Sequence, residues 1–151
     1  MKTSGSNQRP FGLGREKGIL MGIECRLYRE QNELHLIAEG TITIEEVRAH
    51  LRKEQENSEL AYRHLMDARN AMMRLSPVNV REIVKLLGTL PQTSRLGPTA
   101  IVVSTEVAYG MMRMLQILVE DVCVVEPFRD FAEAQQWLRS FKLPVSKATG
   151  K

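Results

Sequence analysis

The sequence lacks long apolar runs, paired cysteine motifs and an apolar leader, and each absence excludes a class of protein. No apolar stretch approaches the roughly 20 residues of a membrane-spanning helix, so no transmembrane segment is expected. The polar N-terminus lacks the longer apolar region of a signal peptide. Cys25 and Cys123 have no CxxC spacing and are interpreted as small buried side chains with free thiols. These features predict a cytoplasmic protein.

Catalytic and metal-binding patterns are also missing. His35, His50 and His64 lack the spacing of metal ligands, and no Cys/His/carboxylate cluster joins them. No P-loop, GxSxG or dinucleotide-binding glycine pattern occurs ahead of a strand and helix. The sequence therefore predicts a protein that is not an enzyme and that holds neither a metal nor a cofactor.

The net charge of +3 comes from the two ends of the chain. The first twenty residues hold four basic residues and one acidic residue, and the last ten hold three lysines. Residues 21–141 therefore carry a net charge of −3. Because nucleic-acid-binding domains have a basic face on their folded part, nucleic acid is not an expected partner.

Hydrophobic periodicity divides the chain into alternating strands and helices. The expected strands are 25–30, 33–39, 62–68, 100–104 and 122–126, with the first two forming a hairpin at Gln31-Asn32. Capping signals start helices after Thr43, near Ser76 and after Asp130, with Asn79 as a competing cap for the second. A further helix is expected over 106–120, and a loop is expected from Arg69 to Pro77.

This order, β-β-α-β-α-β-α-β-α, predicts a single α/β domain with a mixed five-stranded sheet and four helices. We expect the domain over residues 23–142, a disordered N-terminal tail over 1–22 and a flexible C-terminal tail over 143–151.

Several strings resemble the STAS-like superfamily, whose founding members are anti-anti-sigma factors. They are AEGTIT at 38–43, LMDAR at 65–69, AYGMMRMLQ at 108–116 and FRDFAEAQQWL at 128–138. They are closest to an uncharacterised bacterial STAS-like group with an AYGxxRxxQ helix and an FRDxxEAxxWL ending. The resemblance implies a STAS-like fold over roughly residues 24–140 and a bacterial source.

In signalling members of the superfamily, the resemblance implies a phosphorylated Ser or Thr at the start of the second helix. Ser76 is the hydroxyl residue in the matching segment, but the usual Asp-Ser-Ser/Thr-Gly pattern is absent. Ser76 is thus a candidate phosphorylation site, and its simpler interpretation is a helix N-cap followed by proline in the first turn.

The helix over 106–120 carries more apolar surface than one core contact requires. At ~100° per residue its apolar side chains span an arc of about 220°, whereas a helix docked on a sheet needs a stripe of roughly 100°. Neighbouring helices, a second subunit or an apolar ligand are the three candidates for covering the excess.

Methionines gather where the strands end. Five of the eight lie in the loop before the second helix or in the third helix, and open α/β sheets bind ligands at this carboxyl edge. The expected ligand or partner surface comprises Met72, Met73, Arg74, Tyr109, Met111, Met112, Arg113, Met114 and Ile117. Arg69, Arg74 and Arg113 are also candidates for an anion-binding site at this edge. The alternative is that Arg69 forms an ion pair with Asp67.

Three functions follow from these observations. The first is non-catalytic binding, or regulation, through a small apolar or amphiphilic (lipid-like) ligand or a protein partner at the carboxyl edge. The second is an anti-anti-sigma-like protein-interaction switch gated at Ser76. The third is a homodimer that covers the surplus arc of the third helix.

Overall fold

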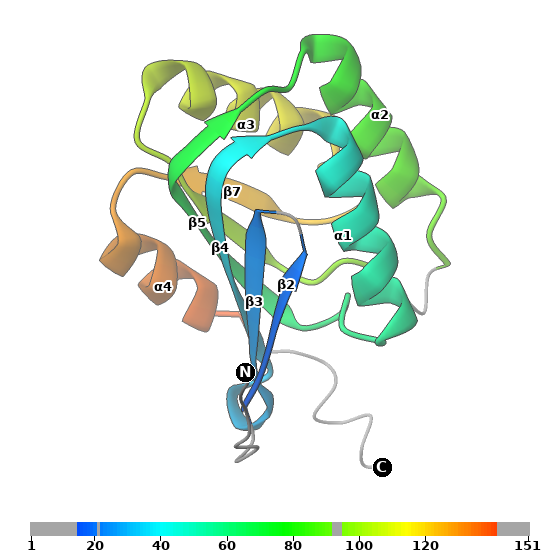
Figure 1. Ribbon diagram of the computed structural model, residues 1–151, viewed down its shortest axis with the longest axis vertical. Helices are drawn as coiled ribbons and strands as arrows, with labels where there is room; N and C mark the ends of the chain where they lie inside the picture. The colour runs from blue at the N-terminus through cyan, green and yellow to red at the C-terminus, as the bar shows by residue number, and fades with distance from the viewer. Residues whose placement is uncertain (1–14, 21, 92–94, 142–151) are drawn as a thin grey trace, which may run out of the picture.

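The computed structural model describes residues 15–20, 22–91 and 95–141 as one mixed β-sheet with helices on both faces (Figure 1). The strands are β2 (Arg15–Leu20), β3 (Ile23–Tyr28), β4 (Glu33–Ile42), β5 (Arg63–Met73), β6 (Thr99–Val102) and β7 (Val125–Phe128). The helices are α1 (Ile44–Glu56), α2 (Pro77–Gly88), α3 (Glu106–Leu118) and α4 (Phe131–Arg139), with a 3-10 turn, η1 (Arg29–Gln31), inside the hairpin.

The strands lie in the sheet in chain order, β2-β3-β4-β5-β6-β7. β2, β3 and β4 pair antiparallel, and β4 to β7 pair parallel. The five expected strands and four expected helices are confirmed in type and order. β2 is additional: it occupies part of the segment that we expected to be a disordered tail. The other tail residues, 1–14, 21 and 143–151, lie outside the described residues.

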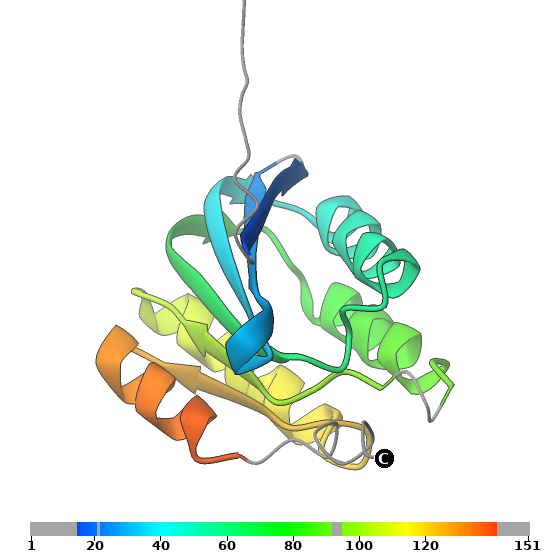
Figure 2. The same ribbon diagram turned by 90° about the horizontal axis from the view of Figure 1, so that it is seen from below.

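Helices α1, α2 and α3 cover one face of the sheet, and α4 covers the other face (Figure 2). The larger core lies beneath the first three helices and includes Leu34, Leu36, Val80 and Met112. A smaller core lies beneath α4 and includes Leu65, Val102 and Leu138. Two separate cores follow from sheet strands that are apolar on both faces.

Two expected boundaries are wrong, for identifiable reasons. The expected loop after residue 68 begins as strand, because β5 continues to Met73 and pairs with Glu39–Ile42 of β4 beyond a bulge. β7 begins at Val125 rather than at Val122, since the amides of Val122 and Cys123 donate to the carbonyl of Val119 in the turn after α3.

Capping explains where the helices begin. The Thr43 amide donates to Glu46 Oε1 over 3.0 Å in a capping box at the start of α1, as expected. The Ser76 hydroxyl accepts from the Asn79 amide over 3.1 Å at the start of α2, and Pro77 follows it. The competing cap at Asn79 is therefore wrong, because Asn79 is the third residue of the helix that Ser76 caps.

β7 is an edge strand that contains a proline. The amides of Thr99 and Val103 donate to the carbonyls of Val124 and Phe128, so every second residue of β7 turns its polar backbone atoms toward β6. Pro127 lies opposite Ile101 between these positions, and its nitrogen therefore faces the outer edge of the sheet. This edge lacks an N–H donor at that point.

Candidate functional site

The parallel strands β4 to β7 all end at one edge of the sheet, and three exposed aliphatic side chains lie at this carboxyl edge. Met72 near the end of β5 is 61% exposed, Val78 in the first turn of α2 is 69% exposed, and Val107 in the first turn of α3 is 76% exposed. Each element begins or ends at the edge, so the topology brings these residues to the same end of the molecule. We call Met72, Val78 and Val107 the carboxyl-edge surface.

The structure divides the residues that the sequence assigned to a binding surface. Met72 and Arg74 are exposed at the carboxyl edge. Met73, Met111 and Met114 are half-buried against the larger core, and Met112 is fully buried within it. A buried Met112 belongs to the core and not to a surface, because α3 turns it toward the sheet.

The remaining predicted residues lie elsewhere on α3. Tyr109 is half-buried, and the guanidinium of Arg129 lies 4.6 Å from its ring centroid. Arg129 is itself held by Glu106 through two hydrogen bonds of 2.8 and 2.9 Å. Arg113 donates to Gln116 over 2.7 Å on the exposed side of the helix, and Ile117 is exposed near its far end.

The three arginines do not form an anion site. Arg69 donates twice to Asp67 over 2.8 Å and lies over the Phe131 ring at 5.3 Å, on the α4 face of the sheet. Arg113 lies on α3, which covers the opposite face. The pairing of Arg69 with Asp67, which we weighed as the alternative, is confirmed.

Ser76 lies between the exposed residues Arg74 and Val78, and its hydroxyl is exposed. The Ser76 amide also donates to Asn79 Oδ1 over 3.0 Å, which completes a reciprocal cap. The hydroxyl is thus both the N-cap of α2 and an exposed phosphorylatable group two residues from Val78 of the carboxyl-edge surface.

Replacing this cap tests what the hydroxyl does for the fold. We expect Ser76→Ala to lower the free energy of unfolding by about 1 kcal/mol, since the Asn79 amide loses its acceptor. Ser76→Asp should stay within a few tenths of a kcal/mol of the original protein, because aspartate caps equally well and its charge suits a helix N-terminus. Urea unfolding of the three proteins measures the difference, and equal losses in both variants would contradict the capping role.

A buried polar cluster that the sequence analysis did not predict lies between α1 and β5. The carboxylate of Glu54 accepts from His50 Nε2 over 2.5 Å through one oxygen and from His64 Nε2 over 2.7 Å through the other. His64 Nδ1 donates to the carbonyl of Tyr62 over 2.7 Å. With Glu54 ionised, both acceptors of His64 lack a proton, so both of its nitrogens carry one and the ring is an imidazolium.

Electrostatics agree with this assignment. Burial favours neutral forms and by itself raises the pKa of Glu54, but the charge of His64 and the hydrogen bonds from both histidines outweigh it and lower that pKa to about 2. Burial likewise opposes the charge on His64, whereas Glu54 and the Tyr62 carbonyl raise the pKa of His64 above its ordinary value. The cluster is a buried ion pair with a second histidine attached. Its His50–Glu54 spacing of four residues was visible in the sequence, but its partner on β5 was not.

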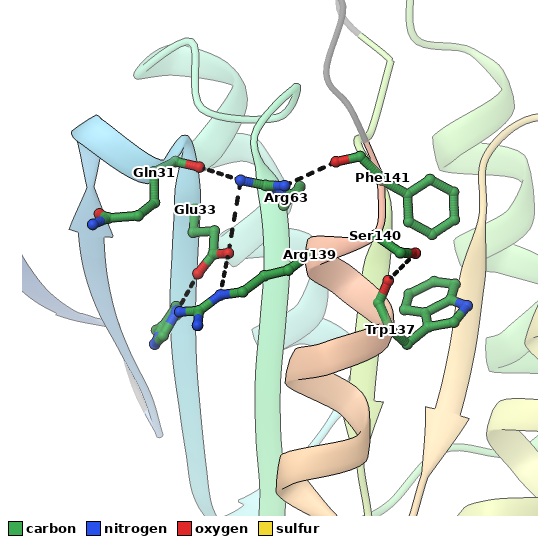
Figure 3. Close-up of polar contacts among 8 residues, drawn as sticks. Gln31, Glu33, Arg63, Trp137, Arg139, Ser140 and Phe141 are labelled. Atoms are coloured by element: carbon green, nitrogen blue, oxygen red, sulfur yellow. Dashed lines mark hydrogen bonds and ion pairs between the residues drawn. The ribbon is translucent and has the colours of Figure 1, made fainter.

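A second buried carboxylate anchors the end of α4 (Figure 3). Glu33 accepts from His35 over 3.0 Å and from Arg139 over 3.2 Å, and Arg63 lies 3.8 Å from the same carboxylate. Burial opposes the charge of Glu33, but hydrogen bonds from His35 and Arg139 lower its pKa below the ordinary value. Arg63 also donates to the carbonyl of Phe141 over 2.8 Å. Both carboxylates are thus neutralised by the chain itself, which indicates structural roles.

Neither a metal-binding cluster nor a membrane-spanning helix is found in the described part of the chain. Within residues 15–20, 22–91 and 95–141, no three His, Cys, Asp or Glu side chains are placed to hold a metal ion together. Among the same residues, none of the helices combines the length and apolarity needed to cross a bilayer.

Comparison with known proteins identifies the fold. No family model matches the chain, and no curated protein matches its sequence. A solved structure with a similar fold is an uncharacterized protein from the DUF3478 family with a SpoIIAA-like fold, from Shewanella loihica PV-4. It is 19% identical, and the match covers 70% of this chain and 83% of that chain with a TM-score of 0.50. The chain therefore has a SpoIIAA-like, that is STAS-like, fold, as the sequence resemblance implied.

Proposed function

We propose that the protein is a non-catalytic STAS-like binding domain that docks a protein partner on its carboxyl-edge surface. The observation that carries this proposal is the exposure of Met72, Val78 and Val107, each more than 60% exposed, at one edge of the sheet. Large apolar side chains gathered on a surface are typical of interaction sites. Flexible methionine and an adjacent arginine, Arg74, suit a partner surface that is apolar and carries acceptor groups.

A protein partner fits this surface better than an enclosed small ligand. Ligand pockets are concave and bury most of the ligand among their walls. The three aliphatic side chains protrude at the ends of β5, α2 and α3, and Met112, which the sequence assigned to the binding surface, is buried in the core. An amphiphilic ligand held on the protruding side chains is the alternative outcome.

Ser76 supports a second candidate function, an interaction switch. Its exposed hydroxyl lies between Arg74 and Val78, and a phosphate there would add about two negative charges beside the carboxyl-edge surface. A phosphate at this N-cap would also be stabilised by the free amides at the start of α2. Phosphorylation would then change partner binding without unfolding the helix.

Photocrosslinking in the source cells tests the proposal. A photoreactive phenylalanine derivative placed at position 107 should yield one discrete protein adduct, because Val107 is the most exposed aliphatic residue at the carboxyl edge. The matched control is position 136, since Gln136 is exposed on α4 at the opposite face of the sheet. Adducts of equal yield at both positions would contradict a docking site at the carboxyl edge.

Two further readouts separate the alternatives. Native mass spectrometry of the gently purified protein should show the bare chain if the partner is a protein, and an added mass of a few hundred daltons if the ligand is amphiphilic. In the crosslinking assay, Val78→Asp should abolish the position-107 adduct with a protein partner. For the switch, Ser76→Asp should alter the adduct yield, whereas Ser76→Ala should preserve it and block modification.

A further inference from the structure

A second group of exposed apolar side chains lies at the other end of α3. Ile117 is 56% exposed and Leu118 is 41% exposed in the last turn of the helix, and Val124 is 45% exposed in the turn that follows. This end of α3 leads back to the start of β7, so the group lies at the amino edge of the parallel strands, opposite the carboxyl-edge surface. Packing against α2 therefore does not cover the whole surplus arc of α3.

Helix geometry separates this group from the core. The core-facing residues of α3 are Met112 and Leu115, both buried. Ile117 and Leu118 follow the half-buried Met114 by three and four residues, so both lie next to Met114, where the core-facing side of the helix meets its exposed side. Residues at this spacing form the seam between two packed helices.

The charges beside this seam would attract the same charges on a second copy of the chain. Arg113 on α3 and Glu120 in the turn directly after the helix are both exposed and have opposite signs. Arg113 precedes Ile117 by one helical turn, and the Glu120 amide donates to the Ile117 carbonyl over 3.5 Å, so the two charges lie on either side of Ile117 along the chain. A two-fold axis near Ile117 that pairs two copies of α3 antiparallel would place Ile117 against Ile117. It would also bring Arg113 of each copy beside Glu120 of the other. The same patch then serves both subunits, as in an isologous dimer.

We propose that the C-terminal half of α3 is a self-association surface and that the chain forms a two-fold dimer through Met114, Ile117 and Leu118, with Arg113–Glu120 pairs at both ends. This inference is independent of the proposed docking function, since the dimer leaves the carboxyl-edge surface uncovered in both copies. A contact made by half a helix from each copy is smaller than a standard stable interface, so the dimer should dissociate on dilution.

Sedimentation equilibrium over a concentration series tests the proposal. The weight-average mass should rise from the 17.2 kDa of one chain toward twice that value as concentration increases. Ile117→Asp should leave a monomer at every concentration. Val107→Asp is the control: it alters the exposed apolar residue at the other end of the same helix and should leave the dimerisation constant unchanged.

Charge reversal tests the two-fold arrangement itself. Arg113→Glu alone and Glu120→Arg alone each turn two attractive contacts into repulsive ones, and each should weaken dimerisation about tenfold. The double variant restores opposite charges and should recover the original dimerisation constant. High salt should reduce the effect of each single reversal on that constant. A chain that stays monomeric at all concentrations, or single reversals without effect, would overturn the proposal. A dimer lost with Val107→Asp but not with Ile117→Asp would place the contact at the carboxyl edge and overturn it equally.

Discussion

Replacing Glu54 by glutamine should lower the free energy of unfolding by about 3–5 kcal/mol, the cost of removing one partner from a buried ion pair. The side chain is fully buried, and each carboxylate oxygen accepts a hydrogen bond from a histidine. Glutamine keeps the size but loses the charge that holds His64 as an imidazolium. Because small domains are stable by only about 5–15 kcal/mol, this single change removes a large part of the total.

The effect should depend on pH in a defined direction. The pKa of His64 is raised above 6.5, so its contribution is complete below pH 6.5 and is lost as pH rises through the folded-state pKa. The pKa of Glu54 is lowered from 4.5 to about 2, so its contribution is present above pH 4.5 and is lost as pH falls toward 2. The difference between the original protein and Glu54→Gln should therefore be largest between pH 4.5 and 6.5.

Urea unfolding at pH 5, 7 and 9 measures this profile. Glu56→Gln is the matched control, because Glu56 is exposed in the last turn of the same helix, and its effect should stay within about 0.5 kcal/mol at each pH. A difference for Glu54→Gln that is the same at pH 5 and pH 9 would show that His64 is not charged in the folded protein.

The second large effect is expected at Gly97. A Cβ atom at this position would collide with the carbonyl oxygens of Ala61 and Tyr62, the first at only 2.5 Å. Both are backbone atoms and cannot rotate away, so the segment before β5 would have to move. The Tyr62 carbonyl is also the acceptor for His64 Nδ1, and its displacement would disturb the buried imidazolium. We expect Gly97→Ala to cost at least about 3 kcal/mol, the upper range for overpacking.

A second glycine provides the matched control. Gly110 lies within α3, and a Cβ atom there would have no neighbour within 4 Å. Gly110→Ala should therefore raise the free energy of unfolding by about 0.5–1 kcal/mol, through the entropy that glycine loses in a helix. Thermal unfolding of the two variants should give shifts of opposite sign, and a stabilised Gly97→Ala would show that the segment before β5 is free to move.

Local sequence patterns predicted most of the helices and strands, whereas features that depend on long-range contacts could not be predicted from the sequence. Hydrophobic period and capping placed the four helices, because Thr43, Ser76 and Asp130 satisfy amides within their own first turn. The sequence analysis did not predict β2, because its sequence, REKGIL, lacks the alternating pattern of a strand. Its extended structure comes from pairing with β3.

The polar clusters were hidden for the same reason. His50 and Glu54 are neighbours on α1, but His64 joins them through the packing of α1 against β5, which no spacing reveals. The sequence analysis did identify the surplus apolar arc of α3. It did not distinguish Met112, which the sheet covers, from Ile117, which remains exposed, because that choice depends on where the core lies.

The proline in β7 has a consequence for how copies of this chain can assemble. Edge-to-edge pairing of sheets is open-ended, since each added copy exposes a fresh edge and the series continues into a fibre. An incoming strand would find no N–H at Pro127 to complete the ladder, so strand addition on that side would lack a hydrogen bond and is disfavoured. The two-fold contact proposed through α3, in contrast, would close after two copies. Pro127 and the proposed α3 contact would together favour a closed pair of chains over a growing fibre.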